Sequence, residues 1–453
     1  MKQANKTGFS SRLGFVMAAA GSAVGLGNIW RFPYLAAKYG GGIFLLVYLV
    51  LAVTFGFALM TTEIAIGRRT GKSAILAYKA INKKFSFLGY IASAVPILIF
   101  PYYCVIGGWI VKYMTVYFAG QAHAAAADDY FSTFISGTAQ PIVFLAIFLF
   151  CTALVVLIGV QKGIEKVSKV MMPLLVILCV VIAVFALTID GALAGLKYYL
   201  LPDFSKFSSA TVLGALGQLF YSMSLAMGIM ITYGSYMKKE DNIEKSVRQI
   251  EIFDTGIALL AGLIIIPSVV AFNGGSADGI NAGPGLMFIT LPQVFNAMGP
   301  IGGVVGTLFF LLVFFAAITS SISLMETVVS MVRDKFHWRR IPTTIAVTIG
   351  IIALGSLSVF GYGPLANFKI LGMQMLDFFD FISNSVLMPI VAFLTCILVG
   401  HVVGTKVIAD EVGLSAKFTG EKLHRVMIKW VAPILLVVIL IAQVLSAFGV
   451  ITI

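Results

Sequence analysis

The sequence predicts an all-α membrane protein with eleven transmembrane helices, and three features lead to that prediction. The chain has 453 residues, of which 60% are hydrophobic and 11% charged, and its mean hydropathy is +1.01. A soluble protein is about one quarter charged. Long apolar runs recur along the chain, and basic residues alternate between the loops that join them. Secreted domains, cytosolic enzymes and disordered scaffolds are therefore excluded.

Eleven apolar runs are long enough to cross a bilayer, which takes about 20 helical residues. In chain order they are 13–37, 41–67, 88–119, 141–159, 167–189, 210–236, 250–272, 301–332, 341–360, 371–399 and 426–448. No loop between them is long enough to bury a core of its own. We therefore expect a single domain over residues 1–453.

The basic residues predict the orientation of these helices. Of the 31 Lys and Arg residues, all but six lie in the N-terminal segment and in every second loop; the six exceptions are Arg31, Lys38, Lys112, Lys197, Lys206 and Lys369. Loops rich in Lys and Arg stay in the cytoplasm. This predicts a multi-pass protein of the inner (plasma) membrane with a cytoplasmic N-terminus and Ile453 outside. The net charge of +12 thus reflects topology, and no nucleic-acid partner is expected.

Two of the runs contain residues that interrupt helices. Residues 21–33 of the first run read GSAVGLGNIWRFP, and residues 217–236 of the sixth read GQLFYSMSLAMGIMITYGSY. Small residues alone also allow close helix packing. Non-helical backbone within a membrane is tolerated where it lines a cavity, so both runs are candidates for broken helices.

The positions of the two interrupted runs suggest a transport function. They are the first elements of two groups of five spans, about 12–189 and 210–400, followed by an additional helix at about 426–448. Because five is odd, the second group is inverted relative to the first, and interrupted helices at matching places of inverted halves are typical of a transporter's midplane site. Free N–H groups at one break attract a carboxylate and free carbonyls attract Na⁺ or an ammonium group, as an amino-acid zwitterion requires.

Four segments resemble the neurotransmitter:sodium symporter family. They are RLGFVMAAAGSAVGLGNIWRFPYLAAKYGGGIF (12–44), KGIEKVSKVMMP (162–173), ITYGSYM (231–237) and FFAAITSSISLME (314–326). The resemblance implies the leucine-transporter fold, a 5+5 inverted repeat with broken helices 1 and 6, in the eleven-span form of bacterial members. It also implies Na⁺-coupled import of an amino acid by alternating access.

The resemblance further implies two Na⁺ sites. One would use Ala23, Asn28, Ser222 and Asp254; the other would use Gly21, Val24, Ala316, Thr319 and Ser320. All-oxygen coordination suits a hard cation, although Thr319 and Ser320 could instead bond to carbonyls of their own helix. Because Asp254 would supply a permanent negative charge where many members have Asn and need chloride, no chloride requirement is expected.

The substrate site implied by the resemblance lies between the two breaks. It would comprise Ser22, Ala23, Leu26, Gly27, Ile99, Tyr103, Tyr221, Ser222, Ser224, Met227, Ser320 and Leu324. The N–H groups of Leu26 and Gly27 and the Tyr103 hydroxyl would bind the carboxylate. Gly25 stands where monoamine-transporting relatives have Asp, so the substrate should bring its own carboxylate. A neutral L-amino acid is expected, with small to medium side chains favoured because Ala226 replaces a glycine of relatives that handle bulky ones.

The resemblance assigns two gates and leaves two rival functions open. Arg31 and Asp380 would form the outer gate, and Lys6 and Asp334 the inner one. Glu63 is expected in the polar network near the first break. A proton-coupled amino-acid transporter of the same fold is one rival, and an amino-acid sensor that does not transport is the other. An intramembrane enzyme is not expected, since His123, His337, His401 and His424 all fall in loops or at span ends.

Overall fold

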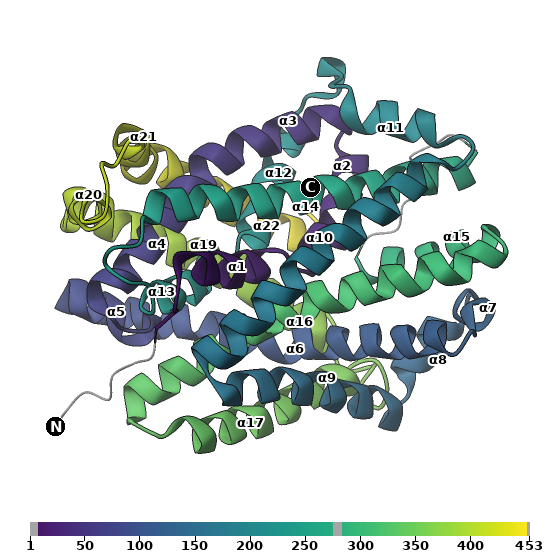
Figure 1. Cartoon of the computed structure of the whole chain (residues 1–453), viewed down its shortest axis with the longest axis horizontal. Coiled ribbons are helices and arrows are strands. Elements are labelled where there is room, and N and C mark those ends of the chain that lie inside the picture. Colours follow the sequence, from purple (N-terminus) through teal and green to yellow (C-terminus); the bar gives the residue numbers. More distant parts are fainter. Residues whose placement is uncertain (1–7, 275–282, 451–453) are drawn as a thin grey trace.

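The computed structural model describes residues 8–274 and 283–450, and these residues form a bundle of long helices (Figure 1). Nine helical stretches are long and apolar enough to cross a membrane. They are Gly42–Thr70, Lys83–Phe118, Ala139–Ile158, Val160–Leu187, Ile243–Phe272, Pro300–Phe336, Arg340–Phe360, Met375–Val402 and Glu421–Ala447. The described residues contain isolated β-bridges, Gly41 with Pro202 and Ile370 with Met373, but no strand.

The first predicted span is a broken helix, as expected. Helix α1 (Arg12–Ala23) begins after Ser11, whose side chain accepts a hydrogen bond from the N–H of Gly14 and so caps the first turn. The chain leaves the helical conformation at Val24 and resumes as a π-helical turn, η1 (Gly27–Arg31), followed by α2 (Phe32–Lys38). The two halves are bent by 53°.

The sixth predicted span is broken as well. Helix α12 (Ser209–Ser222) and helix α13 (Ile229–Gly234) are separated by residues 223–228, which are not helical. Three residues of this connection, Ser224, Ala226 and Gly228, have positive φ angles of 53°, 58° and 72°. Each half of this span is too short to cross a membrane alone. The described residues therefore contain nine helices long enough to span, or ten if the bent pair 12–38 is one span. The total of eleven stays a prediction.

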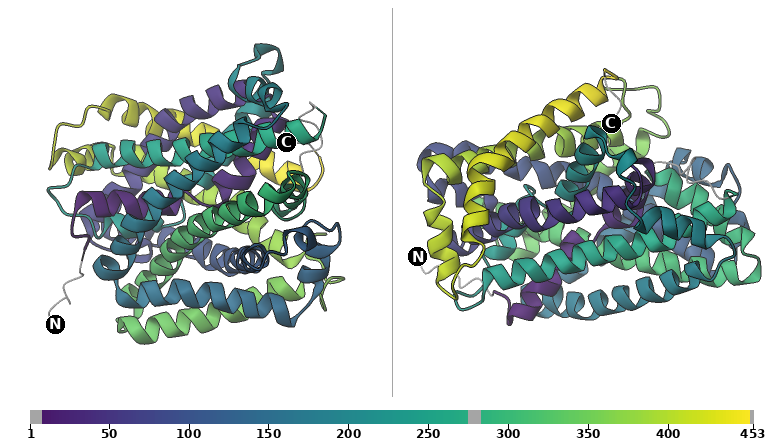
Figure 2. Two further views of the ribbon diagram at one scale, coloured as in Figure 1. Left: turned by 45° about the vertical axis from the view of Figure 1, so that its right-hand side comes forward. Right: turned by 90° about the horizontal axis from the view of Figure 1, so that it is seen from above.

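The long helices enclose these broken ones. Helices α6 (Ser86–Phe118) and α16 (Pro300–Phe336) pack along each other, and at their crossing a Cβ on Gly306 would lie 2.0 Å from the Tyr117 ring. Glycine therefore permits the close approach. Helix α14 (Ile243–Phe272) packs against α1 and α10 (Lys166–Leu187). Figure 2 shows the other outer helices around this core, among them α9 (Ala139–Ile158), α17 (Arg340–Phe360) and α22 (Ala432–Ala447).

Short helices lie at the two ends of the bundle. Helices α5 (Ala74–Ile81), α20 (Lys406–Gly413) and α21 (Glu421–Val426) lie at one end (Figure 1). Helices α7 (Ala122–Ala125), α11 (Ala192–Leu200) and α15 (Leu291–Ala297) lie at the other. The basic loops thus share one end of the molecule.

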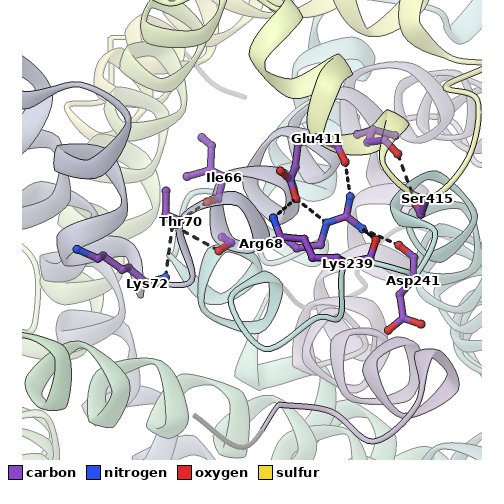
Figure 3. A network of polar contacts seen from close by, with 10 residues as sticks. Ile66, Arg68, Thr70, Lys72, Lys239, Asp241, Glu411 and Ser415 are labelled. Carbon is purple, nitrogen blue, oxygen red and sulfur yellow. Dashed lines mark hydrogen bonds and ion pairs between the residues drawn. The ribbon is translucent and has the colours of Figure 1, made fainter. Parts of the chain in front are cut away.

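A buried arginine joins three segments at the basic end (Figure 3). Arg68, at the end of α4 (Phe57–Thr70), pairs through Nε with Oε1 of Glu411 on α20 at 2.8 Å. Its Nη1 donates to the carbonyl of Asp241 at 2.6 Å, and its Nη2 donates to the carbonyl of Glu411. Lys239 binds the same Glu411 oxygen at 2.8 Å. Helix α20 is thereby fixed to the loop that follows α13.

Candidate functional site

The two helix breaks lie against each other and are joined by side chains. The Ser224 hydroxyl donates to the carbonyl of Ser22 at 3.0 Å, and the Ser22 and Ser224 hydroxyl oxygens are 3.3 Å apart. Gln218 Nε2 donates to the carbonyl of Gly27 at 2.9 Å. These contacts therefore join the two interruptions and stabilise them together.

Glu63 also belongs to this region, but its contact is with the second break. Its Oε1 accepts a hydrogen bond from the N–H of Ala226 at 2.7 Å. Ala226 has a left-handed backbone that costs an L-residue about 1 kcal/mol or more. The carboxyl group therefore helps to hold the unusual conformation of the connection between α12 and α13.

A small pocket of about 30 Å³ lies between the breaks. The structure places all twelve predicted substrate residues in its lining, together with Gly25 and Ile229. They come from α1, the two breaks, α6, α12, α13 and α16. No Lys, Arg, Asp or Glu is among these fourteen lining residues. Ala226 is not part of the lining, so its Cβ does not narrow the pocket directly.

Gly25 lies where two hydroxyl groups converge on the pocket. A Cβ built on Gly25 would lie 2.8 Å from Ser320 Oγ and 3.3 Å from the Tyr103 hydroxyl. The Tyr103 hydroxyl is buried and has no hydrogen-bond partner among the described residues. A buried polar group without a partner is costly, so this hydroxyl is suited to binding a polar group of a ligand.

A buried carboxylate lies beside the first break. Asp254 Oδ1 accepts hydrogen bonds from Asn28 Nδ2 and Ser222 Oγ, both at 2.8 Å, and Oδ2 accepts one from the Tyr48 hydroxyl at 3.2 Å. Asn28 Oδ1 accepts from the N–H of Gly25 at 3.0 Å. All these partners are neutral, and a buried charge normally needs an opposite one. Three of the four residues predicted for the first Na⁺ site thus form one cluster, and the fourth, Ala23, lines the adjoining pocket.

Tyr48 is expected to tune ion binding through this cluster. Tyr48→Phe removes one hydrogen bond to Asp254, typically worth about 1 kcal/mol, so we expect the Na⁺ concentration for half-maximal uptake to change about fivefold. Uptake measured over a Na⁺ titration in proteoliposomes would detect this change. Tyr113→Phe, which removes a hydrogen bond to the Phe288 carbonyl instead, should leave the Na⁺ dependence unchanged. An unaltered titration for Tyr48→Phe would contradict the role given to the cluster.

The residues predicted for the second Na⁺ site meet between α1 and α16. The Ser320 hydroxyl donates across to α1 and lies 3.3 Å from the carbonyls of Gly21 and Val24 and 3.0 Å from that of Ser22. The Thr319 hydroxyl is 3.1 Å from the Ala316 carbonyl and 2.9 Å from that of Phe315. Thr319 therefore bonds to its own helix, whereas Ser320 does not. The set consists of neutral oxygens, which fits a hard monovalent cation.

The structure places the predicted outer gate residues near the pocket without joining them. The Arg31 guanidinium carbon is 5.4 Å from the centroid of the Tyr221 ring. Asp380 Oδ1 accepts hydrogen bonds from the Tyr102 hydroxyl at 3.0 Å and from Asn384 Nδ2 at 2.5 Å. Within the described residues, no ion pair links Arg31 to Asp380. The expected contact is therefore absent from this conformation, because Asp380 binds neutral donors instead.

At the opposite side, the predicted inner gate is only partly described. Lys6 lies outside the described residues, and Asp334 accepts two hydrogen bonds from Ser73 at 2.8 Å. The chain just before α1 is held by other groups. Glu165 accepts from Ser10 N and Ser10 Oγ at 2.7 and 2.5 Å, and Lys238 donates to the Ser10 carbonyl at 2.7 Å.

The match to a family model covers nearly the whole chain. The model of the sodium:neurotransmitter symporter family matches residues 6–133 and 130–450.

The chain belongs to this family.

Individual relatives of the symporter and the solved structure of a similar protein agree with that assignment. An uncharacterized sodium-dependent transporter of Bacillus subtilis, YhdH, is 37% identical over 404 residues, which is 88% of each chain. The sodium- and chloride-dependent taurine transporter of the dog is 28% identical, covering 88% of this chain and 72% of its own. A crystal structure of MhsT in complex with L-phenylalanine matches with a TM-score of 0.87 and 36% identity, over 97% of this chain and 100% of MhsT.

These comparisons confirm the coarse predictions. The symporter is an all-helical, multi-pass membrane protein with the leucine-transporter fold, and it is a sodium-dependent transporter rather than an enzyme.

Several site residues of the symporter were not predicted. Tyr48 occurs in the apolar sequence LLVYLVLAV, where a tyrosine fits ordinary packing equally well. Glu165 and Lys238 lie next to other charged residues in basic segments, where nothing distinguishes them from their neighbours. Their contacts with Ser10 join positions more than 150 residues apart, so local sequence offered no indication of them.

Proposed function

We propose that the symporter imports a neutral L-amino acid of small to medium size together with Na⁺, without a requirement for chloride. The observation that carries this proposal is the uncharged pocket between the two breaks, with the buried Asp254 cluster beside it. A zwitterion has no net charge and fits such a lining, whereas a charged side chain would lack a partner. The complex of MhsT with L-phenylalanine supports an amino-acid substrate.

Two Na⁺ ions are proposed, one at each set of oxygens. Ala23, Asn28, Ser222 and Asp254 would hold the first, and the substrate carboxylate would complete its coordination. Gly21, Val24, Ala316, Thr319 and Ser320 would hold the second. The negative charge of Asp254 supports independence from chloride, because the anion that a neutral site would recruit is already part of the chain.

Transport would follow alternating access between two inverted halves, residues about 12–189 and 210–400, with the helix at 426–448 outside the repeat. The end that carries α5, α20 and α21 would face the cytoplasm, and Ile453 the outside. Arg31 and Asp380 would approach each other when the outer side closes over Tyr221. Asp334 and Lys6 would close the inner side, with Glu165 and Lys238 holding the segment before α1.

Uptake into proteoliposomes tests this proposal directly. The purified symporter would be given a panel of labelled amino acids under inward gradients of Na⁺, K⁺ or H⁺, with chloride or gluconate as the anion. We expect accumulation of neutral amino acids under the Na⁺ gradient alone, equal in both anions. Accumulation driven by H⁺ alone would contradict the Na⁺ sites, and binding without accumulation would identify a sensor.

Met227 is expected to limit the size of the substrate. It lines the pocket and is almost fully buried, and one methylene in such a pocket changes selectivity by about 1–3 kcal/mol. For Met227→Ala we expect the ratio of kcat/KM for phenylalanine to that for alanine to rise at least about tenfold. Met17→Ala, at a partly buried position outside the pocket, is the control. An unchanged ratio would place the substrate side chain elsewhere.

A further inference from the structure

A second, larger pocket lies at the basic end of the bundle, away from the transport site. Its volume is about 630 Å³, and it lies between α20 and the ends of two spans. These ends are η8 (Leu398–Val402) and the stretch from α21 into η9 (Met427–Val431). Figures 1 and 2 show these C-terminal helices at one edge of the molecule. Both flanking helices are long and apolar enough to cross a membrane, and the pocket lies at their ends.

Cationic side chains outnumber acidic ones in this pocket. Lys406, Arg425 and Lys429 line it, as do Asp410 and Glu421. Arg425 Nη2 pairs with Glu421 Oε1 at 2.5 Å, one helical turn away. The side chains of Lys406 and Asp410 form no hydrogen bond or ion pair with any described residue. The pocket therefore offers one ammonium group, that of Lys406, and one carboxylate, that of Asp410, that the fold itself does not use.

The span Glu421–Ala447, which carries three of these charged residues, also presents an apolar face. Glu421, Arg425 and Lys429 follow each other at spacings of four residues and face the pocket. The neighbouring face carries large exposed apolar side chains: Val426, Trp430, Ile434, Val437 and Ile441. This span is also the least buried of the nine, because only 28% of its most apolar stretch is buried inside the protein. A charged stripe that ends in a pocket thus runs beside an apolar stripe that faces lipid.

An aromatic pair marks the boundary between the two faces. The Trp430 ring packs edge-on against His401, with centroids 5.6 Å apart, and Lys429 Nζ lies 5.6 Å from the Trp430 centroid. Tryptophan is enriched at the headgroup level of membranes. A tryptophan beside the pocket favours an opening at the level of the lipid headgroups.

We propose that this pocket binds the headgroup of an anionic phospholipid of the phosphatidylglycerol type. Lys406 and Lys429 would bind the phosphodiester, and Asp410 would accept a hydrogen bond from a headgroup hydroxyl. The acyl chains would lie on the apolar face from Val426 to Ile441. Basic pockets between span ends on the cytoplasmic side favour anionic headgroups. A soluble phosphate would make no use of the apolar face, and an ethanolamine headgroup would bring its ammonium group against the lysines.

Lipid retention measures this binding without reference to transport. The full-length symporter would be reconstituted in nanodiscs of equal phosphatidylglycerol and phosphatidylethanolamine, released, and analysed by native mass spectrometry for bound lipid. We expect phosphatidylglycerol to be retained preferentially. For Lys406→Gln/Lys429→Gln we expect its retention to fall about tenfold, because both phosphate contacts are lost.

A matched double variant separates this site from general surface charge. Lys417→Gln/Lys422→Gln removes the same charge from exposed positions between α20 and η9 that do not line the pocket. This variant should retain phosphatidylglycerol like the unmodified chain. Lys406→Arg/Lys429→Arg should also retain phosphatidylglycerol and would show that the protein tolerates substitution at both positions. Equal loss in the two glutamine variants, equal retention of phosphatidylethanolamine, or displacement of the lipid by glycerol 3-phosphate at similar concentration would overturn the proposal.

Discussion

Replacing Asp254 with Asn is expected to abolish Na⁺-driven uptake in chloride-free buffer, or to make uptake depend on chloride. Asparagine has nearly the same shape, so its side-chain oxygen can still accept from Asn28 and Ser222, which now donate at 2.8 Å. The negative charge is lost, and an amide nitrogen replaces the oxygen that accepts from the Tyr48 hydroxyl. At an effective dielectric constant of about 20, a carboxylate and a cation 4 Å apart attract by about 4 kcal/mol. We therefore expect a loss of about 100-fold or more in kcat/KM without chloride.

The measurement is uptake of the best substrate by Asp254→Asn under a Na⁺ gradient, with a chloride titration against gluconate. Recovery of uptake by chloride would identify the missing charge as the cause. Asp190→Asn changes an exposed acid outside the spans and should behave like the unmodified symporter. Uptake by Asp254→Asn that is unchanged and indifferent to chloride would contradict both the first ion site and chloride independence.

The substitution Gly25→Ala is expected to have a comparable effect by filling the pocket. The added Cβ would lie 2.8 Å from Ser320 Oγ, in the space between that hydroxyl and the Tyr103 hydroxyl. Gly25 is not among the residues with positive φ, so alanine can adopt its backbone conformation and the helix break should be retained. We expect uptake to fall about 100-fold or more while the protein stays folded.

Thermal stability with and without Na⁺ distinguishes a filled pocket from a misfolded protein. The folded variant should unfold close to the temperature of the unmodified protein in the absence of ligands, and it should lose the added stabilisation by substrate in Na⁺. Gly350→Ala, where the new Cβ would have no neighbour within 4 Å, is the matched control. Near-normal uptake by Gly25→Ala would mean that the carboxylate of the substrate does not bind here.

The sequence predicted the fold through features that do not depend on distant contacts. Lipid exposure requires long apolar runs, and a break within such a run requires small or polar residues, as in 21–33 and 217–236. The family resemblance then placed twelve residues that the structure brings together in one lining. The location of the pocket was therefore predictable to the level of single residues.

Other features depend on packing that no local pattern encodes. The Tyr48 hydroxyl meets Asp254 although the two residues lie about 200 positions apart in the sequence. Asp380 was expected opposite Arg31, yet it binds Tyr102 and Asn384, since an acidic residue near a helix start can be satisfied by any nearby donor. Ala226 was expected to narrow the pocket with its Cβ, but it does not line the pocket. Side-chain direction in a non-helical segment follows φ angles that the sequence does not specify.

Two serine hydroxyls belong to the pocket and to the proposed ion positions at once. Ser222 lines the pocket and donates to Asp254, and Ser320 lines it and donates to the carbonyls of α1. A ligand that reorients either hydroxyl changes the free energy of both neighbouring positions. Thermodynamic linkage then requires that substrate change the affinity for Na⁺ by the same factor as Na⁺ changes the affinity for substrate. The two shared hydroxyls thus couple the occupancy of the pocket to that of both proposed ion positions.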